Sequence, residues 1–300
     1  MKKIIILGAT GMLGHQVIKV FSQDNNYEII ATYRNKKDLK NICRNNKNIT
    51  FVRYDVLKNK DFPSILNKKI HSIINCIGII KPHINENDVR SIKKAIFVNS
   101  FFPHKLFYHF SKNDKNIRIF QIATDCVFNG VKGKYTETDS HNADDIYGKS
   151  KSLGEVNNEN FFNIRCSIIG KELKSYKSLL EWFLNLKSNS KISGFANHKW
   201  NGLTTKAYSE FLKTIIDNNI KIPRSIHVLP ADSVSKYEML FLLKKIFSKK
   251  DLYISRINHA SKVDRTLTTK NLKLIKNIWS ESLYKKTPTI KDMLMEIKND

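Results

Sequence analysis

This chain of 300 residues lacks long hydrophobic runs, internal repeats and low-complexity linkers. No stretch approaches the roughly 20 apolar residues that a membrane-spanning helix requires. The apolar run near the N-terminus is interrupted by Gly8 and Gly11 and has no small-residue cleavage site, so we expect neither secretion nor membrane insertion. With 41% hydrophobic residues, the chain can bury one large core, or a large core with a smaller lobe.

The chain also lacks paired cysteines. Cys43, Cys76, Cys126 and Cys166 are scattered, with no Cys-x-x-Cys pair and no histidine at a zinc-type spacing. This pattern predicts reduced thiols in apolar surroundings, no metal site and a cytoplasmic protein.

Acidic side chains are few, because 27 Asp and Glu oppose 52 Lys and Arg, giving a formal net charge of +25. Such a charge suggests nucleic-acid binding, since basic surfaces attract polyanions in a salt-dependent way. The lysines are spread along the chain, in polar pieces such as 58–60 and 113–116, and do not gather in one arm. The distribution favours solvated surfaces over a nucleic-acid partner, and the same field would attract a small anionic substrate.

Three glycines follow a predicted buried strand at 2–7 and precede a helical pattern. Gly8 would make a tight turn, Gly11 would let a pyrophosphate approach the backbone, and Gly14 would let the helix pack closely on the strand. The N–H groups and dipole at the helix N-terminus favour phosphate. The spacing Gly-x-x-Gly-x-x-Gly departs from the fingerprint Gly-x-Gly-x-x-Gly, but its context predicts a bound dinucleotide.

A second strand is predicted at 27–33, and its end should lie beside the adenosine ribose of that dinucleotide. An acidic residue there would bind the 2′-hydroxyl of NAD, whereas this chain has Arg34, followed by Lys36 and Lys37. We therefore predict NADPH as the cofactor, with NADH as the alternative.

Strand-like and helical segments alternate through the first half of the chain, which is typical of a doubly wound α/β fold of the Rossmann type with a parallel sheet. Further strands are predicted at 49–54, 72–77, 117–123 and 161–166, and helices at 61–66, 86–110 with a bend at Pro103, and 146–156.

After about residue 167 the alternation loosens. We predict an NADP-binding domain with the catalytic residues at 1–166 and a mainly substrate-binding lobe at 167–300. The boundary stays open, because later strands could rejoin the main sheet. Helices of the lobe are predicted at 176–186, 205–216, 234–247 and 290–297.

Tyr147 and Lys151 are four residues apart on a predicted helix, so they lie on one face, one turn from each other. A cation in that place would favour phenolate and lower the tyrosine pKa from about 10, making Tyr147 a general acid near neutrality. The pair predicts the protonation or deprotonation of an oxygen.

In open α/β sheets, ligands bind outside the carboxyl ends of the strands. Cys76 and Gly78 follow the fourth strand, where small residues would let backbone pass close to a cofactor, and Thr124 follows the fifth. The Thr124 hydroxyl could donate to a carbonyl oxygen while Tyr147 supplies the proton. A simple turn or helix cap at Thr124 is the alternative, but three segments converging on one crevice favour catalysis.

The glycine pattern, Thr124, Tyr147 and Lys151 together resemble an extended short-chain dehydrogenase/reductase. Residues 124–130 and 147–155 resemble the dTDP-4-dehydrorhamnose reductase group of sugar-nucleotide 4-ketoreductases. The likeness continues through 163–165, 200–205, 233–237 and 264–268.

The resemblance implies NADPH-dependent reduction of the 4-keto group of a nucleotide-linked 4-keto-6-deoxy sugar, in the synthesis of a deoxy sugar for surface polysaccharide. Tyr147 would protonate the alkoxide, Thr124 would bind the same oxygen, and Lys151 would hold the nicotinamide ribose. The implied cofactor-binding residues are Gly8, Thr10, Gly11, Met12, Leu13, Arg34, Asp55, Val56, Cys76, Gly78, Asn99, Tyr147 and Lys151.

The same resemblance suggests substrate contacts. Arg165 and Arg265 are candidates for the diphosphate, since planar guanidinium groups pair bidentately with phosphate. Trp200 could stack on the nucleobase or sugar, with ordinary packing as the alternative. The remaining implied substrate-binding residues are Asp125, Val127 and Phe128.

Three departures from the group, at four positions, are present. Ala123 replaces the usual Ser, Cys126 stands where related dehydratases carry Glu, and His198 and Lys199 replace the usual acidic residue and glutamine. The second departure disfavours a dehydratase. A sugar-nucleotide epimerase and a non-catalytic NADP-binding regulatory subunit remain the alternatives, and a homodimer is a candidate assembly.

Overall fold

The computed structural model describes residues 1–42, 46–67, 69–174 and 176–299. Cys43 lies outside the described residues, whereas Cys76, Cys126 and Cys166 are free thiols. Within the described ranges, no group of three or more His, Cys, Asp or Glu is placed to hold a metal ion. The same ranges contain no helix long and apolar enough to cross a membrane.

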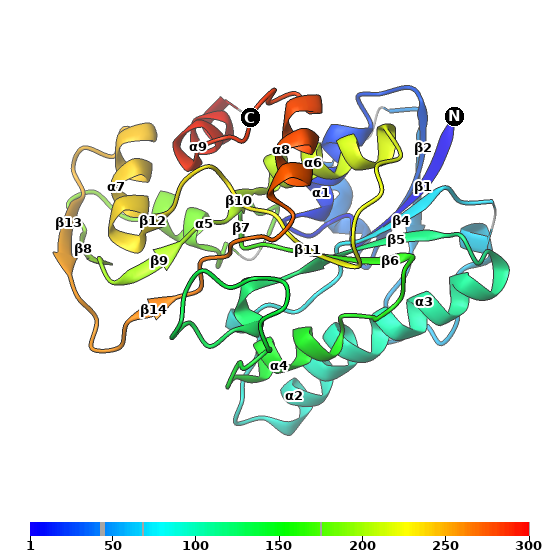
Figure 1. Ribbon diagram of the computed structural model, residues 1–300, viewed down its shortest axis with the longest axis horizontal. Coiled ribbons are helices and arrows are strands. Elements are labelled where there is room, and N and C mark those ends of the chain that lie inside the picture. Colours follow the sequence, from blue (N-terminus) through cyan, green and yellow to red (C-terminus); the bar gives the residue numbers. More distant parts are fainter. Residues whose placement is uncertain (43–45, 68, 175, 300) are drawn as a thin grey trace.

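A seven-stranded parallel sheet forms the centre of the molecule (Figure 1). The strand order is β11-β6-β5-β4-β1-β2-β3, which confirms the doubly wound α/β prediction. The predicted strands of the first half are confirmed to within two residues at either end. Their bounds are β1 Lys2–Leu7, β2 Tyr27–Tyr33, β3 Ile49–Arg53, β4 Ser72–Asn75, β5 Arg118–Ala123 and β6 Phe161–Arg165, with β11 at Ser225–His227.

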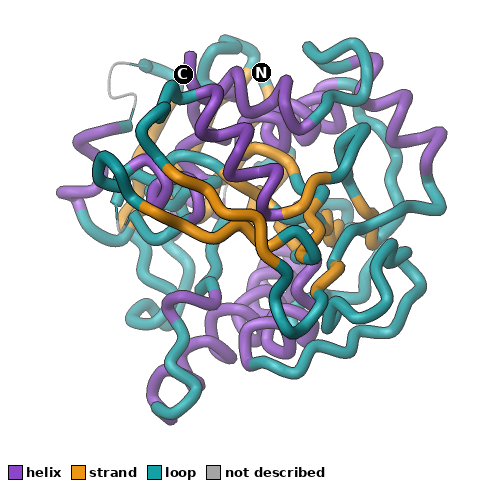
Figure 2. Tube along the Cα trace, turned by 90° about the vertical axis from the view of Figure 1, so that its left-hand side faces the viewer, coloured by secondary structure: helices purple, strands orange, loops and turns teal. Residues whose placement is uncertain are grey.

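Both faces of the sheet are covered by helices (Figure 2). Alternate residues of a strand point to opposite faces, so Ile4 and Ile6 join one apolar cluster while Ile5 and Leu7 join the other. This double burial explains why the strands read as almost continuous apolar runs. Helices α1 Gly14–Phe21 and α6 Thr205–Asp217 lie on one side, and α2 Val89–Ile96, α3 Phe102–Asn113 and α4 Ile146–Leu153 lie on the other (Figure 1).

The predicted helix at 86–110 consists of α2, a π-helical turn η4 at Phe97–Phe101, and α3. Pro103 lies in the first turn of α3, directly after the π turn, so the helix changes its hydrogen-bonding pattern there, and the expected bend stays a prediction. Proline lacks an N–H, so the Asn99 carbonyl four residues earlier has no α-helical donor. The wider π turn accommodates that missing hydrogen bond.

The predicted α-helix at 61–66 is wrong. Only a short 3₁₀ turn, η2, is present there, at Ser64–Asn67. Pro63 explains the difference, since the residue before a proline is pushed out of the helical region. Further 3₁₀ turns are η1 Lys36–Asn41, η3 Lys81–His83 and η5 Asp125–Val127.

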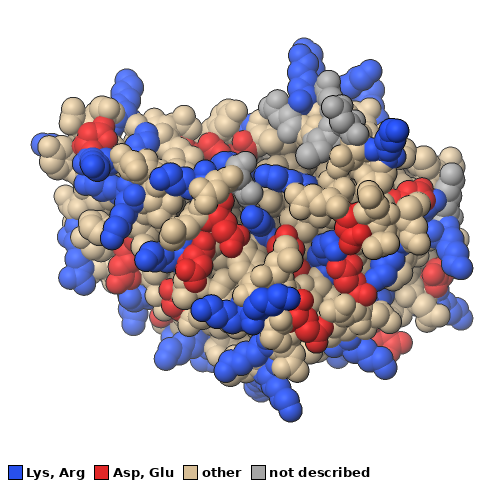
Figure 3. All heavy atoms as spheres, turned by 90° about the horizontal axis from the view of Figure 1, so that it is seen from above, with Lys and Arg blue, Asp and Glu red and all other residues tan. Residues whose placement is uncertain are grey.

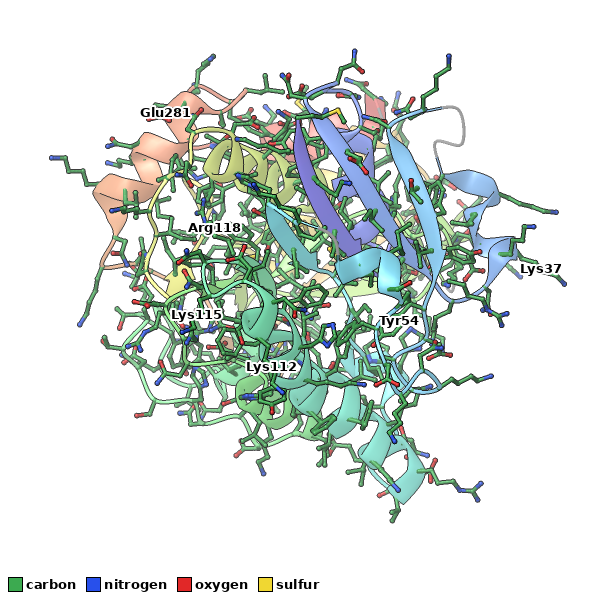
Figure 4. The ribbon with its side chains drawn as sticks, turned by 90° about the vertical axis from the view of Figure 1, so that its right-hand side faces the viewer. Lys37, Tyr54, Lys112, Lys115, Arg118 and Glu281 are labelled. Atoms are coloured by element: carbon green, nitrogen blue, oxygen red, sulfur yellow. The ribbon has the colours of Figure 1, made fainter. Side chains whose placement is uncertain are left out.

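Tyr54, which follows β3, is buried between the sheet and α3 (Figure 4). Its ring stacks on Phe62 with 5.3 Å between centroids and lies 6.3 Å from Phe102. These contacts close the apolar cluster on the α3 side of the sheet. Lys37, in η1 after β2, lies at the exposed edge of the molecule in the same view.

The second half of the chain contributes to the main sheet and also forms a lobe. β11 pairs with β6, so the sheet crosses the boundary near residue 167. The apolar cluster on the α1 side continues into the lobe without a break. The lobe contains α5 Leu179–Leu184, α7 Lys236–Ile246, α9 Ile290–Asn299, β7 Ile168–Ile169, β8 Lys191–Phe195, β9 His198–Trp200, β10 Leu203–Thr204, β12 Val234–Ser235, β13 Tyr253–Ile257 and β14 Val263–Asp264.

One further helix, α8 at Leu272–Glu281, is not among the predicted elements. Its buried residues Ile275, Ile278 and Trp279 follow helical spacing, so the periodic signal for it is present in the sequence. Trp279 packs against Phe211 of α6, with 4.9 Å between ring centroids. α8 thereby covers the outer side of α6.

Candidate active site

The strand order reverses between β1 and β4, because β2 and β3 lie on one side of β1 while β4, β5 and β6 lie on the other. A crevice forms outside the carboxyl ends of the strands at such a point, and ligands of doubly wound folds bind there. The loops after β1, β4 and β5 all leave this end of the sheet, and they carry the glycine turn, residues 76–78 and Thr124.

The glycine turn after β1 has the geometry of a phosphate cradle. Gly8 adopts a left-handed φ of +82°, and its N–H donates to the Thr32 hydroxyl at 3.0 Å. The Gly11 N–H donates to the Gly8 carbonyl at 3.0 Å. A Cβ at Gly14 would lie 2.1 Å from the Gly8 carbonyl oxygen, so only glycine allows α1 to start this close to the strand.

The start of α1 leaves donors available for an anion. In the part of the chain that the structure describes, the backbone N–H groups of Met12 and Leu13 make no hydrogen bond. Unpaired N–H groups at a helix N-terminus bind phosphate well, so this turn fits a pyrophosphate. Arg34 is exposed after β2, on the same side of the sheet end.

The predicted cofactor contacts at Asp55 and Val56 are less open. The Asp55 carboxylate accepts the Leu57 N–H at 3.0 Å and so caps its own turn. Val56 is 7% exposed and belongs to the apolar cluster under the sheet. The side chain of Val56 therefore faces the core, which leaves its backbone as the part that could contact a ligand.

Residues 76–78 follow β4 against the glycine turn. The Cys76 N–H donates to the Leu7 carbonyl at 3.0 Å, and burial raises the pKa of the Cys76 thiol to about 12. Gly78 packs against the Asn99 side chain, because a Cβ at Gly78 would lie 3.5 Å from Asn99 Oδ1. This segment is thus a neutral, small-residue wall of the crevice.

Asn99 is a positioning residue in this structure. Its Oδ1 accepts the Ile79 N–H at 2.8 Å, while its Nδ2 donates to the Ile79 carbonyl at 2.9 Å and to the Ser150 hydroxyl at 3.1 Å. The side chain is 1% exposed, so the prediction that it contacts the cofactor is wrong. Asn99 instead connects the loop after β4 to α4 between Tyr147 and Lys151.

Two glycines let α4 lie close to its neighbours. A Cβ at Gly148 would lie 2.2 Å from the Cys126 carbonyl, and a Cβ at Gly154 would lie 1.8 Å from the Asn99 carbonyl. The Asp145 carboxylate caps the helix by accepting the Gly148 N–H at 2.7 Å and pairs with Lys81 at 2.8 Å. These contacts hold the Tyr147 helix against the turn that carries Thr124.

Thr124 combines the two roles that its sequence allows. Its hydroxyl accepts the Cys126 N–H at 3.2 Å, which caps η5, and donates to Asp125 Oδ1 at 3.2 Å. The same hydroxyl interacts with the Tyr147 side chain and lowers the tyrosine pKa. Thr124 and Tyr147 are therefore brought together, as predicted.

The pKa of Tyr147 does not follow the sequence-based expectation. Burial raises it above the usual range, and Cys126, Asp125 and Asp145 add to the increase. Lys151 Nζ donates to the Ile122 carbonyl at 2.7 Å, and burial lowers the pKa of Lys151 to about 8. The expected lowering of the tyrosine pKa is wrong, because burial raises that pKa and the Lys151 ammonium is directed at the Ile122 carbonyl.

Asp125 adds a third titratable group beside Tyr147. It is 7% exposed, and burial raises its pKa while the Arg265 charge lowers it. Cys126 Sγ donates to Asp125 Oδ1 at 3.7 Å, and burial raises the pKa of that thiol to about 12. The raised pKa values of Tyr147 and Cys126 thus keep the phenol and the thiol of this cleft neutral near pH 7.

Two predicted substrate contacts are wrong for their side chains. Val127 and Phe128 are both fully buried and pack with Tyr135 and Leu267 in a small apolar cluster. The Phe128 ring stacks on Tyr135 with 4.2 Å between centroids. The loop after η5 turns these side chains inward, so they support the cleft from behind.

The prediction that Arg165 binds the substrate diphosphate is also wrong. Arg165 is 1% exposed, and it forms a two-fold ion pair with Glu155, with Nε–Oε1 3.1 Å and Nη2–Oε2 2.6 Å. It also donates to His141 Nε2 at 2.9 Å and to His227 Nε2. Its guanidinium therefore has no exposed edge for a ligand.

Arg265 and Trp200 remain candidates. Arg265 Nε donates to the Phe128 carbonyl at 2.8 Å and Nη2 to the Asn129 carbonyl at 3.2 Å, while the residue stays partly exposed. Its charge acts on Asp125, which places it beside the cleft. Trp200 Nε1 donates to the Ser167 hydroxyl at 2.8 Å, and its partly buried ring packs on the core.

Sequence reasoning missed Glu155 and the two histidines that surround Arg165. For Glu155 a signal exists, since Tyr147, Lys151 and Glu155 are each four residues apart. His141 and His227 have no such signal. His141 is 24 residues from Arg165 along the chain, and His227 is 62 residues from it.

The sheet topology, the glycine turn and the meeting of Thr124, Tyr147 and Lys151 define an extended short-chain dehydrogenase/reductase. The family model of the RmlD substrate binding domain matches residues 1–299, and the chain belongs to this family.

Two curated relatives match about half of this chain. The dTDP-4-dehydrorhamnose reductase of Aggregatibacter actinomycetemcomitans is 31% identical over 160 residues, covering 52% of this chain and 46% of that protein. Methionine adenosyltransferase 2 subunit beta of Bos taurus is 27% identical over 167 residues, covering 51% and 42%. The matched segment thus spans less than half of each relative.

Solved structures match nearly the whole chain. A hypothetical dTDP-4-dehydrorhamnose reductase from Sulfolobus tokodaii has a TM-score of 0.72 at 21% identity, covering 92% of this chain and 94% of that one. The Bacillus anthracis enzyme in complex with NADP has a TM-score of 0.70 at 17% identity, covering 99% of both. UDP-glucuronic acid 4-epimerase from Bacillus cereus, with UDP-glucuronic acid and NAD, has a TM-score of 0.75 at 16% identity, covering 99% of both. At these identities the likeness establishes the fold.

Proposed function

We propose that this protein is a cytoplasmic enzyme that uses NADPH to reduce the 4-keto group of a nucleotide-linked 4-keto-6-deoxy sugar. The product would be a deoxy sugar for surface polysaccharide. The observation that carries the proposal is the meeting of Thr124, Tyr147 and Lys151 at the carboxyl end of β5, beside the glycine turn. Membership in the RmlD substrate binding domain family supports it.

The cofactor site fits a dinucleotide by the chemistry of its donors. Gly8, Thr10, Gly11, Met12 and Leu13 would hold the pyrophosphate, and exposed Arg34 would pair with the 2′-phosphate. NADH is the alternative if Arg34 is only a surface cation. When bound, the cofactor supplies the hydride.

The chain's own residues would handle the proton. The raised pKa of Tyr147 keeps its phenol protonated at neutral pH, so it can give a proton to a developing alkoxide. The Thr124 hydroxyl would donate to the same oxygen, and the Lys151 ammonium would hold the ribose. In this structure the Thr124 hydroxyl donates to Asp125 Oδ1 at 3.2 Å, so its single proton would turn from Asp125 to the substrate oxygen when the substrate binds.

We assign substrate binding mainly to the lobe after residue 167. Arg265 would contact the diphosphate, and Trp200 would stack on the nucleobase or sugar. On the face shown in Figure 3, basic side chains are interspersed with acidic and uncharged ones. That scatter supports a small anionic substrate over a nucleic acid as the partner.

Two alternatives have specific support. A 4-epimerase of known structure shares the fold, and an epimerase would keep its cofactor without consuming it. The match to subunit beta of methionine adenosyltransferase 2 leaves a role as a non-catalytic subunit of a larger enzyme as the second alternative. The retained Thr124, Tyr147 and Lys151 favour an active enzyme over that role.

The test is NADPH oxidation, followed by absorbance, with UDP-, dTDP- and GDP-linked 4-keto-6-deoxy sugars, for wild type and Tyr147→Phe. Oxidation that requires one sugar nucleotide and collapses in the variant is the expected result. If NADPH binds but no sugar oxidises it, the reductase proposal fails and the two alternatives move ahead. A homodimer would be tested separately by light scattering.

A further inference from the structure

A buried ion pair lies behind the proposed catalytic helix. Glu155 follows the end of α4. Both of its carboxylate oxygens accept hydrogen bonds from Arg165 of β6, at 3.1 Å and 2.6 Å. Arg165 is 1% exposed and the Glu155 side chain 9%. Burying an ion pair costs more free energy than the pairing returns unless further hydrogen bonds satisfy both groups. The other partners of Arg165 and Glu155 therefore matter.

Two histidines complete the pair on the side away from Glu155. His141 accepts from Arg165 Nη2 at 2.9 Å, and its Nδ1 lies 2.7 Å from the Ser152 hydroxyl of α4. His227 accepts from Arg165 Nη1, and its Nδ1–H faces the carbonyls of Thr268, at 2.8 Å, and Tyr135, at 3.1 Å. The guanidinium is held from three sides, which fixes the Glu155 carboxylate in turn.

Glu155 follows Lys151 by four residues along the chain, just beyond the end of α4. Tyr147, Lys151 and Glu155 are spaced by four residues, and the Gly154 and Glu155 N–H groups continue the last turn with bonds to Lys151 and Ser152 carbonyls, each 3.2 Å. Burial lowers the pKa of Lys151 to about 8, and the Glu155 charge opposes that change. Glu155, just beyond the end of α4, is thus an acidic charge that acts on Lys151.

Other ionisable groups approach Lys151 and Glu155 from neighbouring elements. His227 stays neutral, because burial and the Arg165 charge lower its pKa to about 4. Burial lowers the pKa of His141, which Glu155 partly offsets. The ionisable groups in contact with Glu155 are Arg165 at the end of β6 and His141 before α4, and His227 of β11 contacts Arg165 from another side.

We propose that Glu155 is a positioning residue that keeps Lys151 charged: Arg165, completed by His141 and His227, clamps its carboxylate one helical turn beyond the lysine. A buried ammonium without this carboxylate would lose its proton and with it the charge assigned to the cofactor ribose. The consequence for catalysis rests on the proposed function, whereas the effect on the lysine does not.

The first experiment measures the lysine directly. NMR titration of protein labelled with ¹³C at lysine Cε gives the protonation midpoint of Lys151, assigned with Lys151→Arg. We expect a wild-type midpoint near the pKa of about 8, below those of the surface lysines. In Glu155→Gln, which removes the charge and keeps the shape, the proton affinity of Lys151 should fall about tenfold or more, which is about one pKa unit. Glu155→Asp should restore much of it.

Two further variants separate this role from general damage. Glu155→Gln leaves Arg165 buried without its partner and could unfold the protein, so Glu155→Gln/Arg165→Met replaces both charges by neutral groups. The protonation midpoint of Lys151 should fall in the double variant too, although that variant also lacks the positive charge of Arg165. Glu181→Gln is the matched control, since Glu181 is a buried carboxylate of α5 that accepts the Glu172 N–H at 3.0 Å. It should leave the Lys151 midpoint unchanged.

The two proposals fail separately. An unchanged Lys151 midpoint in folded Glu155→Gln and in the double variant overturns the role of Glu155, whatever the enzyme reduces. A shifted midpoint with no oxidation of NADPH by any sugar nucleotide supports the role of Glu155 and overturns the reductase. If both proposals hold, the pH above which NADPH oxidation declines should be lower in Glu155→Gln than in wild type, by the same amount as the lysine midpoint.

Discussion

The two sides of the candidate site are built by different means. The cofactor side is made from backbone: a left-handed glycine, free N–H groups at the start of α1, and a wall of small residues after β4. The catalytic side is made from buried side chains that come from η5, α4, β6 and β11. Backbone geometry is a local property, whereas a buried polar cluster requires several distant segments to fold correctly.

This contrast predicts different responses to substitution. The glycine turn should tolerate substitutions that avoid a steric clash, whereas substitutions that create one should destabilise the protein strongly. Substitutions on the catalytic side should have graded effects that depend on pH, because ionisable groups stabilise that side.

The largest effect is expected for Gly14→Ala. Its Cβ would lie 2.1 Å from the Gly8 carbonyl oxygen, and backbone cannot yield as a flexible side chain would. We expect a loss of about 3 kcal/mol or more in the free energy of unfolding, measured with urea, and loss of NADPH binding. The matched control is Gly11→Ala, whose Cβ would lie at an ordinary 3.4 Å from the same oxygen. Equal stability losses in both variants would contradict the steric argument.

Acid should weaken the catalytic side first. His227 has a folded-state pKa of about 4 against 6.5 for its unperturbed value. The unfolded state then binds more protons between these pH values, so stability falls as pH decreases through that window. The contribution is on the order of 3 kcal/mol. Urea unfolding from pH 7 to pH 4 measures it, and His227→Gln should flatten the dependence; the same slope in the variant would mean that other groups are responsible.

Thr124→Val should reduce the proposed NADPH oxidation about 10²-fold in kcat, because a donor to the developing alkoxide is removed. Part of the change could come from the lost cap on η5, since the hydroxyl also accepts the Cys126 N–H. Thr124→Ser keeps the hydroxyl and should retain most activity. If valine and serine behave alike, the hydroxyl has no catalytic role.

The smallest effect is expected on the cofactor side, for Arg34→Ser. Loss of one exposed charge-assisted contact to the 2′-phosphate should weaken NADPH binding about tenfold, or about 1.4 kcal/mol. NADH binding should stay the same, as measured by fluorescence titration of both cofactors. A loss that affects both cofactors equally would show that Arg34 does not read the 2′-phosphate.

Elements with strong local patterns were predictable. β1 and β2 are almost entirely apolar because both sheet faces are covered, and they start and end as expected. The helix at 61–66 failed because a proline in its first turn blocks helical geometry before residue 64. The π turn at Phe97–Phe101 was not among the predicted elements, although Pro103, which removes the donor to the Asn99 carbonyl, is a local signal for it.

By itself, the sequence determined the parts of this protein that depend on short spacing: the glycine turn, the Tyr147 and Lys151 pair on one helix face, and the run of buried strands. Only the tertiary structure decided which charges face a ligand. Arg165 and Arg265 are the same residue type, yet one is enclosed by Glu155, His141 and His227 while the other stays partly exposed beside Asp125. The physical reason is that the availability of a charge depends on the partners that distant segments bring to it, and the spacing along the chain does not contain those partners.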